Sequence, residues 1–178
     1  LKTIATAKHY AVHSGPEVDR HRFDARVTRR ELFDTYLPHF EQAVRGGRVE
    51  SVMSAYNAVD GIPVSASRFL LGDLLRARWA FGGYVVSDCG AIHDIWATHR
   101  YAGDAAEASA LAVRAGTDLE CGSDFRSLTN AVARGLVTSA EIDRAVTRLF
   151  TARVRLGLFD PPERVAYAQT PYSVNDAP

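Results

Sequence analysis

The apolar residues of this chain fall into two kinds of pattern that alternate along it. Four short segments are rich in apolar and β-branched residues, as buried strands are, and they span 3–10, 49–57, 83–88 and 116–121. Segments with apolar residues at helical spacing lie between them. Because parallel strands are joined by crossovers that are usually helical, this alternation predicts an α/β fold with parallel strands.

Capping signals and glycines set the expected helix boundaries. Thr28 and Glu31 form a capping box, Thr138 and Glu141 form another, and the leucines after Ser67 have helical spacing. Glycine is common just beyond the end of a helix. The predicted helices run from Thr28 toward Gly46, from Ser67 onward, from Asp104 to Gly116, over 125–134, and from Thr138 to Gly157.

Four strand–helix units make half of an eight-stranded barrel. We therefore expect residues 1–160 to form the C-terminal half of a TIM-like (β/α)8 barrel whose first strands are missing from this chain. The segment 161–178 is rich in Pro, Ala and polar residues, which is typical of a linker toward a following domain. The chain begins at Leu1 without an initiator Met or a signal peptide, so we expect it to be part of a longer protein.

Composition excludes several classes of partner. The 178 residues contain 21 Lys plus Arg and 21 Asp plus Glu, so no net charge draws the chain to nucleic acid. No apolar run is long enough to span a bilayer. The histidines His13, His21, His93 and His99 lack the i, i+4 spacing of a helix-borne metal site, so we expect no metal.

Polar residues follow the apolar part of every predicted strand. In parallel α/β folds ligands bind at the carboxyl ends of the strands, so these groups are expected to face one rim. An aspartate in that position is a functional candidate, although it could also cap the next turn. Cations, an amide, a phenol and carboxylates around one mouth suit a neutral polyhydroxylated ligand. The groups are Lys8-His9, Tyr56-Asn57, Ser87-Asp88 and Asp118 with Glu120-Cys121.

Several of these candidates also have structural interpretations. Lys8 and His9 alone would more often be a structural pair, but their place at a strand end favours binding. Tyr56 could be a packing residue or could hold a carboxylate in its ionised form by hydrogen bonding. Met53 could equally be core or pocket wall. Trp79, at the end of a helix, is expected to lie in the core.

The two cysteines leave a further choice open. Cys89 and Cys121 are too few for a disulfide scaffold and their spacing fits no zinc site, so two buried thiols are expected from number alone. Each one, however, closes an apolar strand and precedes a glycine, so both should emerge at the same rim. A disulfide across that rim fits the same placement.

Taken together, these segments resemble the barrel domain of family 3 glycoside hydrolases, which are retaining exo-acting β-glucosidases and β-xylosidases. The resemblance runs nearly from end to end. It rests on Ala7-Lys8-His9-Tyr10, Ser51 to Asn57, Val85-Val86-Ser87-Asp88, Ala115 to Leu119, and the closing Arg153 to Phe159.

The resemblance implies a role for each candidate residue. Asp88 would be the catalytic nucleophile, Lys8 and His9 would bind hydroxyls of the nonreducing-end sugar, and Tyr56 would support the nucleophile, with Met53 lining the same subsite. Cys89 and Cys121 are similar to the β-xylosidase branch, where a disulfide narrows the subsite. A bridge there would crowd the hydroxymethyl group that glucose has and xylose lacks, which favours β-xylosidase over β-glucosidase.

A retaining enzyme also needs a second carboxyl as acid and base. Hydrolysis by two carboxyls needs neither a metal nor a cofactor, so the resemblance implies neither. The resemblance places that glutamate in a following domain, outside this chain, and leaves Glu120 as either a sugar contact or a supporting residue. An N-acetylhexosaminidase is disfavoured because the loop after His9 lacks the expected Pro-Gly-His-Gly run. A barrel aldolase with Lys8 as Schiff base, and a non-catalytic sugar-binding or scaffold module, are the alternatives of other classes. By analogy, the protein is expected in the periplasm or outside the cell.

Overall fold

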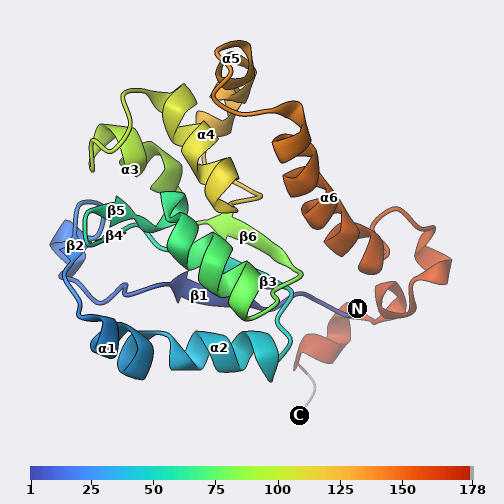
Figure 1. Ribbon diagram of the computed structural model, residues 1–178. Helices are drawn as coiled ribbons and strands as arrows, with labels where there is room; N and C mark the ends of the chain where they lie inside the picture. The colour runs from blue at the N-terminus through green and yellow to red at the C-terminus, as the bar shows by residue number, and fades with distance from the viewer. Residues whose placement is uncertain (177–178) are drawn as a thin grey trace.

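A parallel β-sheet runs through the computed structural model, which describes residues 1–176, the side chains of 175 and 176 excepted (Figure 1). Its strands are β1 (Thr6–Tyr10), β3 (Ser51–Ser54) and β6 (Tyr84–Ser87), in the order β1-β3-β6. Both neighbouring pairs are parallel, with Ala7 opposite Val52 and Val52 opposite Val85. The predicted α/β class with parallel strands and helices is confirmed.

Helical segments connect and follow the strands. Between β1 and β3 lie α1 (Arg29–Glu31), the π-helical η2 (Leu32–Tyr36) and α2 (Pro38–Arg45). The π-helical η4 (Arg68–Arg78) leads to β6, and after it come α3 (Ala91–Ala97), α4 (Ala105–Ala115), α5 (Leu128–Ala133) and α6 (Ser139–Arg155). Short 3-10 turns are η1 (Glu17–Asp19), η3 (Val64–Ala66), η5 (Asp124–Ser127), η6 (Pro162–Arg164), η7 (Ala166–Gln169) and η8 (Tyr172–Asp176).

A second, smaller sheet was not expected from the sequence. It consists of β2 (Asp24–Ala25), β4 (Ala58–Val59) and β5 (Ile62–Pro63), with β2 parallel and β5 antiparallel to β4. These two-residue strands are too short to produce a pattern of alternating polarity. They tie the loop after β1 to the loop after β3.

Both predicted capping boxes are present. The Thr28 backbone N–H donates to Glu31 Oε2 at 2.8 Å while Glu31 N–H donates to Thr28 Oγ1 at 3.2 Å, and Thr138 and Glu141 repeat the arrangement. The single helix expected from Thr28 toward Gly46 is wrong, however. It is interrupted at Leu37, between Tyr36 and Pro38, because proline has no N–H to donate and its ring excludes the preceding turn. Pro38 instead begins α2.

The expected strand at 116–121 is reduced to one parallel bridge between Val86 and Leu119. The side chain of Asp118 explains this, because its Oδ2 accepts the Val85 N–H at 2.8 Å, a donor that a full ladder would pair with a backbone carbonyl. Arg76 and Arg148 both pair with the same carboxylate, whose side chain is 1% exposed. Arg76 also donates to the Gly83 carbonyl, just before β6. Asp118 therefore lies at the amino end of β6 and not, as expected, at the rim.

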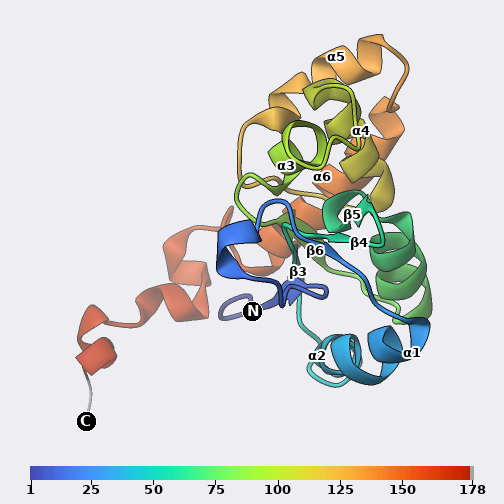
Figure 2. The same ribbon diagram turned by 90° about the vertical axis from the view of Figure 1, so that its left-hand side faces the viewer.

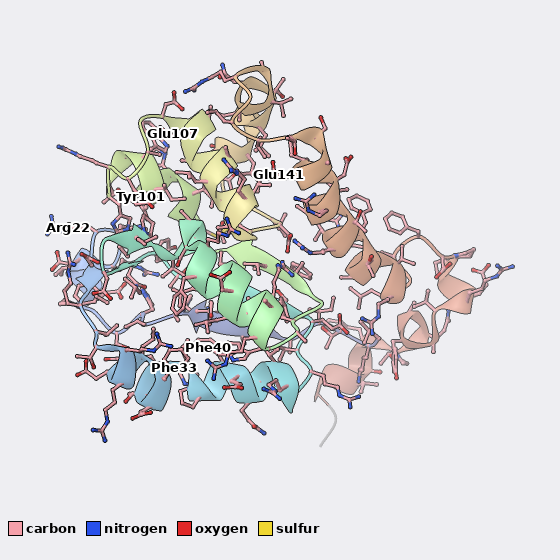
Figure 3. The ribbon with its side chains drawn as sticks, viewed as in Figure 1. Arg22, Phe33, Phe40, Tyr101, Glu107 and Glu141 are labelled. Carbon is pink, nitrogen blue, oxygen red and sulfur yellow. A yellow bond between two sulfur atoms is a disulfide. The ribbon has the colours of Figure 1, made fainter. Side chains whose placement is uncertain are left out.

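The helices pack on one face of the sheet. Val52 and Val85 are fully buried in a core with Leu71 and Leu75 of η4, whereas Met53, on the opposite face of β3, is only partly buried. Phe40, on the sheet side of α2, joins the same core (Figure 3). Trp79 is 3% exposed there, as expected.

Tyr10 connects β1 to η4. Its ring is fully buried, with ring centroids 5.0 Å from Phe40 and 5.9 Å from Trp79, and its hydroxyl donates to the Leu70 carbonyl at 2.8 Å. Burial raises the pKa of this phenol far above its usual range, since the phenolate would lose its hydration in the core.

Replacing Tyr10 by Phe is expected to reduce how steeply the free energy of unfolding falls as the pH rises above about 10. The folded-state pKa of Tyr10 lies above the unfolded value of about 10, so its contribution is full below that pH and is lost as pH rises further. One such group lowers the free energy of unfolding by up to about 1.4 kcal/mol for each pH unit. Urea unfolding at pH 9 to 11 measures the slope, and Tyr101→Phe, at an exposed ring (Figure 3), is the control. Equal slopes for wild type and Tyr10→Phe would contradict the prediction.

The C-terminal segment forms a series of short turns, η6 to η8, which extend away from the sheet (Figure 2). Lys2 lies with its ammonium 5.8 Å from the Tyr167 ring centroid, which links the two ends of the described chain. The linker predicted over 161–178 stays a prediction, and its last two residues lie outside the described ones. In residues 1–176, no helix combines the length and the apolar character that a membrane span requires.

Candidate active site

Asp88 stands directly after β6, as the sequence predicts. Its backbone N–H continues the sheet by donating to the Ser54 carbonyl at 3.0 Å, and its residue is 8% exposed. Carboxylate oxygen Oδ1 accepts the Cys89 N–H at 2.8 Å. Gly90 then turns the chain into α3 with φ of 86°, a conformation that other residues adopt only with strain, although the space around it is open. The turn fixes the carboxylate between strand and helix.

His9 faces the second oxygen of Asp88. The distance from His9 Nε2 to Asp88 Oδ2 is 3.2 Å, but the alignment is poor and Oδ2 makes no hydrogen bond within the described residues. Burial lowers the pKa of His9 and outweighs the opposite pull of the Asp88 charge, while Lys8, His13 and Arg20 lower it further. His9 is therefore a neutral imidazole at neutral pH, and Asp88 keeps a free oxygen.

Tyr56 contacts the same carboxylate from β3's side of the site. Burial raises the pKa of its phenol first of all, and the charge of Asp88 and a hydrogen bond to it raise this pKa further. The phenol is therefore protonated and is placed to donate to the carboxylate. Tyr56 is 7% exposed, so its ring cannot move freely. The structure thus brings together three of the predicted residues: Asp88, His9 and Tyr56.

Lys8 and Met53 lie less deeply. Lys8 is exposed, and among the described residues its ammonium makes no ion pair with Asp88. Met53 pairs with Val86 across β3 and β6, on the sheet face that the helices leave open. Met53 therefore lies outside the helix-packed core, and its place in the wall of a sugar pocket stays a prediction.

Residues of the loop after β1 surround Tyr56, and the sequence reasoning missed their role. The guanidinium of Arg20 lies 4.8 Å from the Tyr56 ring centroid, the His21 ring 4.3 Å and the His13 ring 6.0 Å. Arg20 also affects the site by charge, since its presence lowers the pKa of Tyr56. The signal available was position alone: loops at the carboxyl ends of parallel strands carry ligand contacts.

Cys89 and Cys121 form a disulfide, with Cα atoms 4.3 Å apart. Hydrogen bonds hold the bridged segments together on both sides: Gly90 N–H donates to the Cys121 carbonyl at 2.7 Å and Cys121 N–H donates to Ser87 Oγ at 3.1 Å. The expectation of two buried thiols is wrong, and the disulfide alternative is confirmed. The bridge stands one residue beyond Asp88, at the rim of the site.

The carboxylate of Glu120 supports the start of η5, and whether it also contacts a sugar stays a prediction. Its two carboxylate oxygens accept the backbone N–H groups of Asp124 at 2.8 Å and Phe125 at 2.6 Å, at the start of η5. Asp124 in turn accepts the indole N–H of Trp96 at 2.8 Å. The carboxylates of Glu120 and Asp124 therefore both accept hydrogen bonds from N–H groups of this chain. Among the side chains that the structure describes, up to residue 174, no three His, Cys, Asp or Glu are grouped as a metal site would require.

Comparison with known sequences gives one family. The profile described as "Glycosyl hydrolase family 3 N terminal domain" matches residues 2–152. A probable exo-1,4-β-xylosidase of Aspergillus clavatus is 45% identical over 98% of this chain, and a xylan 1,4-β-xylosidase of Xylanibacter ruminicola is 43% identical over 97%. The chain spans only 24% and 20% of the length of these two relatives.

Solved structures give the same grouping. An exo-β-xylosidase in complex with a xylobiose aziridine probe superposes with a TM-score of 0.91 at 41% identity, over 95% of this chain and 23% of that one. A β-glucosidase from Listeria innocua in complex with glucose superposes with a TM-score of 0.82 at 32% identity, over 93% of this chain and 23% of that one.

Proposed function

The chain belongs to glycoside hydrolase family 3, and from this premise we propose that it forms part of a retaining, exo-acting glycosidase that releases β-linked xylose from the nonreducing end of xylo-oligosaccharides or xylosides. The observation that carries the proposal is the carboxylate of Asp88, which meets a protonated phenol and a neutral imidazole at the end of β6 and keeps one oxygen without a hydrogen bond. A nucleophile needs such a free oxygen.

In the proposed mechanism the carboxylate of Asp88 attacks the anomeric carbon. The glycosidic C–O bond breaks, the leaving oxygen takes a proton from the acid, and a covalent glycosyl-enzyme forms, which water activated by the same group as base then hydrolyses. The Cys89 N–H keeps its hydrogen bond to Oδ1, and the Tyr56 phenol would donate to the same carboxylate and help to hold its orientation. His9 and Lys8 would bind sugar hydroxyls, with Met53 lining the subsite and Arg20 close beside Tyr56.

The acid/base group is proposed to come from outside this chain. Asp88 contacts His9, Tyr56 and the Cys89 backbone within the described residues, and none of these supplies a second carboxyl about 5 to 5.5 Å away. A parallel sheet with helices on one face and an open opposite face fits the C-terminal half of a (β/α)8 barrel over 1–160, completed by strands of the same polypeptide. Residues 161–178 would then lead to the domain that brings the glutamate.

The disulfide supports xylose as the preferred sugar. It stands one residue beyond Asp88, where it would crowd the hydroxymethyl group of a glucoside and leave a xyloside untouched. The names of the two sequence relatives agree with this preference. A β-glucosidase is the second candidate, favoured by the structural likeness to the Listeria enzyme. The disulfide also supports a location in the periplasm or outside the cell, where such bonds persist.

The proposal predicts a substrate preference that depends on the disulfide. In the full-length protein, kcat/KM for an aryl β-xyloside should exceed that for the matching β-glucoside by about 10- to 100-fold, and replacing both Cys89 and Cys121 by Ala should reduce the ratio to within about threefold of unity. The reason is steric, since alanine removes the two sulfur atoms that meet the hydroxymethyl group.

Three outcomes decide between the candidates. A glucoside preference in the wild type would replace xylosidase by glucosidase. A ratio that survives the double substitution would mean that the disulfide does not set the preference. Tight sugar binding without turnover of either glycoside would favour the non-catalytic sugar-binding module and overturn the enzymatic proposal.

A further inference from the structure

Asp94 is a buried carboxylate that the proposed mechanism does not use. It lies in α3, its side chain is 7% exposed, and both of its oxygens have partners. Oδ1 accepts the Thr98 hydroxyl at 2.9 Å and Oδ2 lies 2.7 Å from His21 Nδ1. Burying a carboxylate is costly unless it is paired and hydrogen-bonded, so a specific contact is needed to offset that cost. The contact to His21 crosses 73 residues of sequence.

The pair fixes the His21 ring in one orientation. Because Nδ1 faces a carboxylate, the proton of the neutral ring resides on Nδ1 and is donated to Asp94. This is the arrangement in which a carboxylate orients an imidazole elsewhere in proteins. His21 is half exposed, so without the bond to Asp94 its ring would be free to turn.

The oriented ring packs on Tyr56. The two ring centroids are 4.3 Å apart, at an angle of 55°. The same part of the chain also holds the Tyr56 backbone, because His99, two residues beyond α3, donates from Nε2 to the Tyr56 carbonyl at 2.8 Å. Tyr56 is thus fixed at its ring through His21 and Asp94, and at its backbone through His99.

These contacts form a continuous series of neighbouring residues around the proposed nucleophile, Asp88. The backbone joins Asp88 through Gly90 to α3, Asp94 of α3 contacts His21, and His21 packs on Tyr56. The Tyr56 phenol in turn lies close enough to Asp88 for the charge of that carboxylate to raise its pKa. We infer that His21 and Asp94 are positioning residues, which hold the Tyr56 phenol in place to donate to Asp88. The inference rests on the proposed function of Asp88 and Tyr56.

A coupling experiment in the full-length protein tests this. His21→Ala should lower kcat for an aryl β-xyloside by about 10- to 100-fold with KM changed less than about threefold, because a misplaced group costs rate at the reacting atoms. In a Tyr56→Phe background, where there is no phenol left to position, His21→Ala should change kcat by less than about twofold. His21→Asn, which can still donate to Asp94, should recover part of the loss.

His39→Ala is the matched control, because His39 packs on Phe40 with the same 4.3 Å centroid separation, on α2 and away from the site. It should leave kcat unchanged. Equal losses from His21→Ala in the wild type and in Tyr56→Phe would overturn the inference, as would full activity of His21→Ala. A wild-type protein without glycosidase activity would instead overturn the proposed function, so the two failures are distinguishable.

Discussion

Replacing Asp88 by Asn is expected to lower kcat for an aryl β-xyloside by at least about a thousandfold, because the amide cannot attack the anomeric carbon and loss of a nucleophile costs more than loss of a supporting group. The fold should persist, since the amide oxygen can still accept the Cys89 N–H. Steady-state kinetics on the full-length protein, with thermal unfolding in parallel, measure both effects.

A matched control and a trapping experiment sharpen this test. Asp124 is as buried as Asp88, at 9% and 8% exposed, but its carboxylate accepts the Trp96 indole N–H and lies 3.5 Å from His93 Nδ1, and an amide oxygen can also accept the indole N–H. Asp124→Asn should therefore keep its activity within about threefold. A 2-deoxy-2-fluoro xyloside with a good leaving group should label the peptide that contains Asp88. Undiminished turnover by Asp88→Asn, or a label on another residue, would refute the assignment.

Replacing Asp118 by Asn is expected to destabilise the fold by about 3 to 5 kcal/mol, because breaking one partner of a buried ion pair leaves the other charge uncompensated. The two carboxylate oxygens of Asp118 accept hydrogen bonds from the guanidinium groups of Arg76 and Arg148 and from the Val85 N–H. An amide would turn an NH₂ group toward one of these donors and leave the buried Arg76 guanidinium without its counter-charge.

Urea unfolding monitored by circular dichroism measures the change in free energy of unfolding. Asp34→Asn is the control, because Asp34 pairs with Arg30 at an exposed position and should cost no more than about 0.5 kcal/mol. A cost below about 1 kcal/mol for Asp118→Asn would show that the pair contributes little. The expected result would establish Asp118 as a structural residue, which explains why a carboxylate at a predicted strand has no part in the proposed chemistry.

Much of the site follows from local rules in the sequence. Asp88, His9 and Tyr56 could be placed together because each follows an apolar strand and parallel strands end at one rim. The ends of the helices followed from capping residues, whose hydrogen bonds are local, as at Thr138 and Glu141. The disulfide could be placed as one of two alternatives, because both cysteines occupied the same rim.

The remaining features depend on contacts between distant segments. The strand expected at 116–121 gave way to a single bridge because the Asp118 side chain, rather than a main-chain carbonyl, took the Val85 N–H. The roles of Arg20 and His21 depend on where an irregular loop meets Tyr56, and no periodicity marks such a loop. The break before Pro38 was the exception, since proline itself was a visible signal.

The open sheet also determines how this segment would behave as a separate polypeptide. Within the described residues β1 has a strand neighbour on one side only, and the sheet face that carries Met53 and Val86 has no helix over it. Unpaired strand edges and uncovered apolar surface are the features through which chains aggregate. We therefore expect the chain, expressed by itself, to aggregate more readily the longer this strand edge and this face stay uncovered.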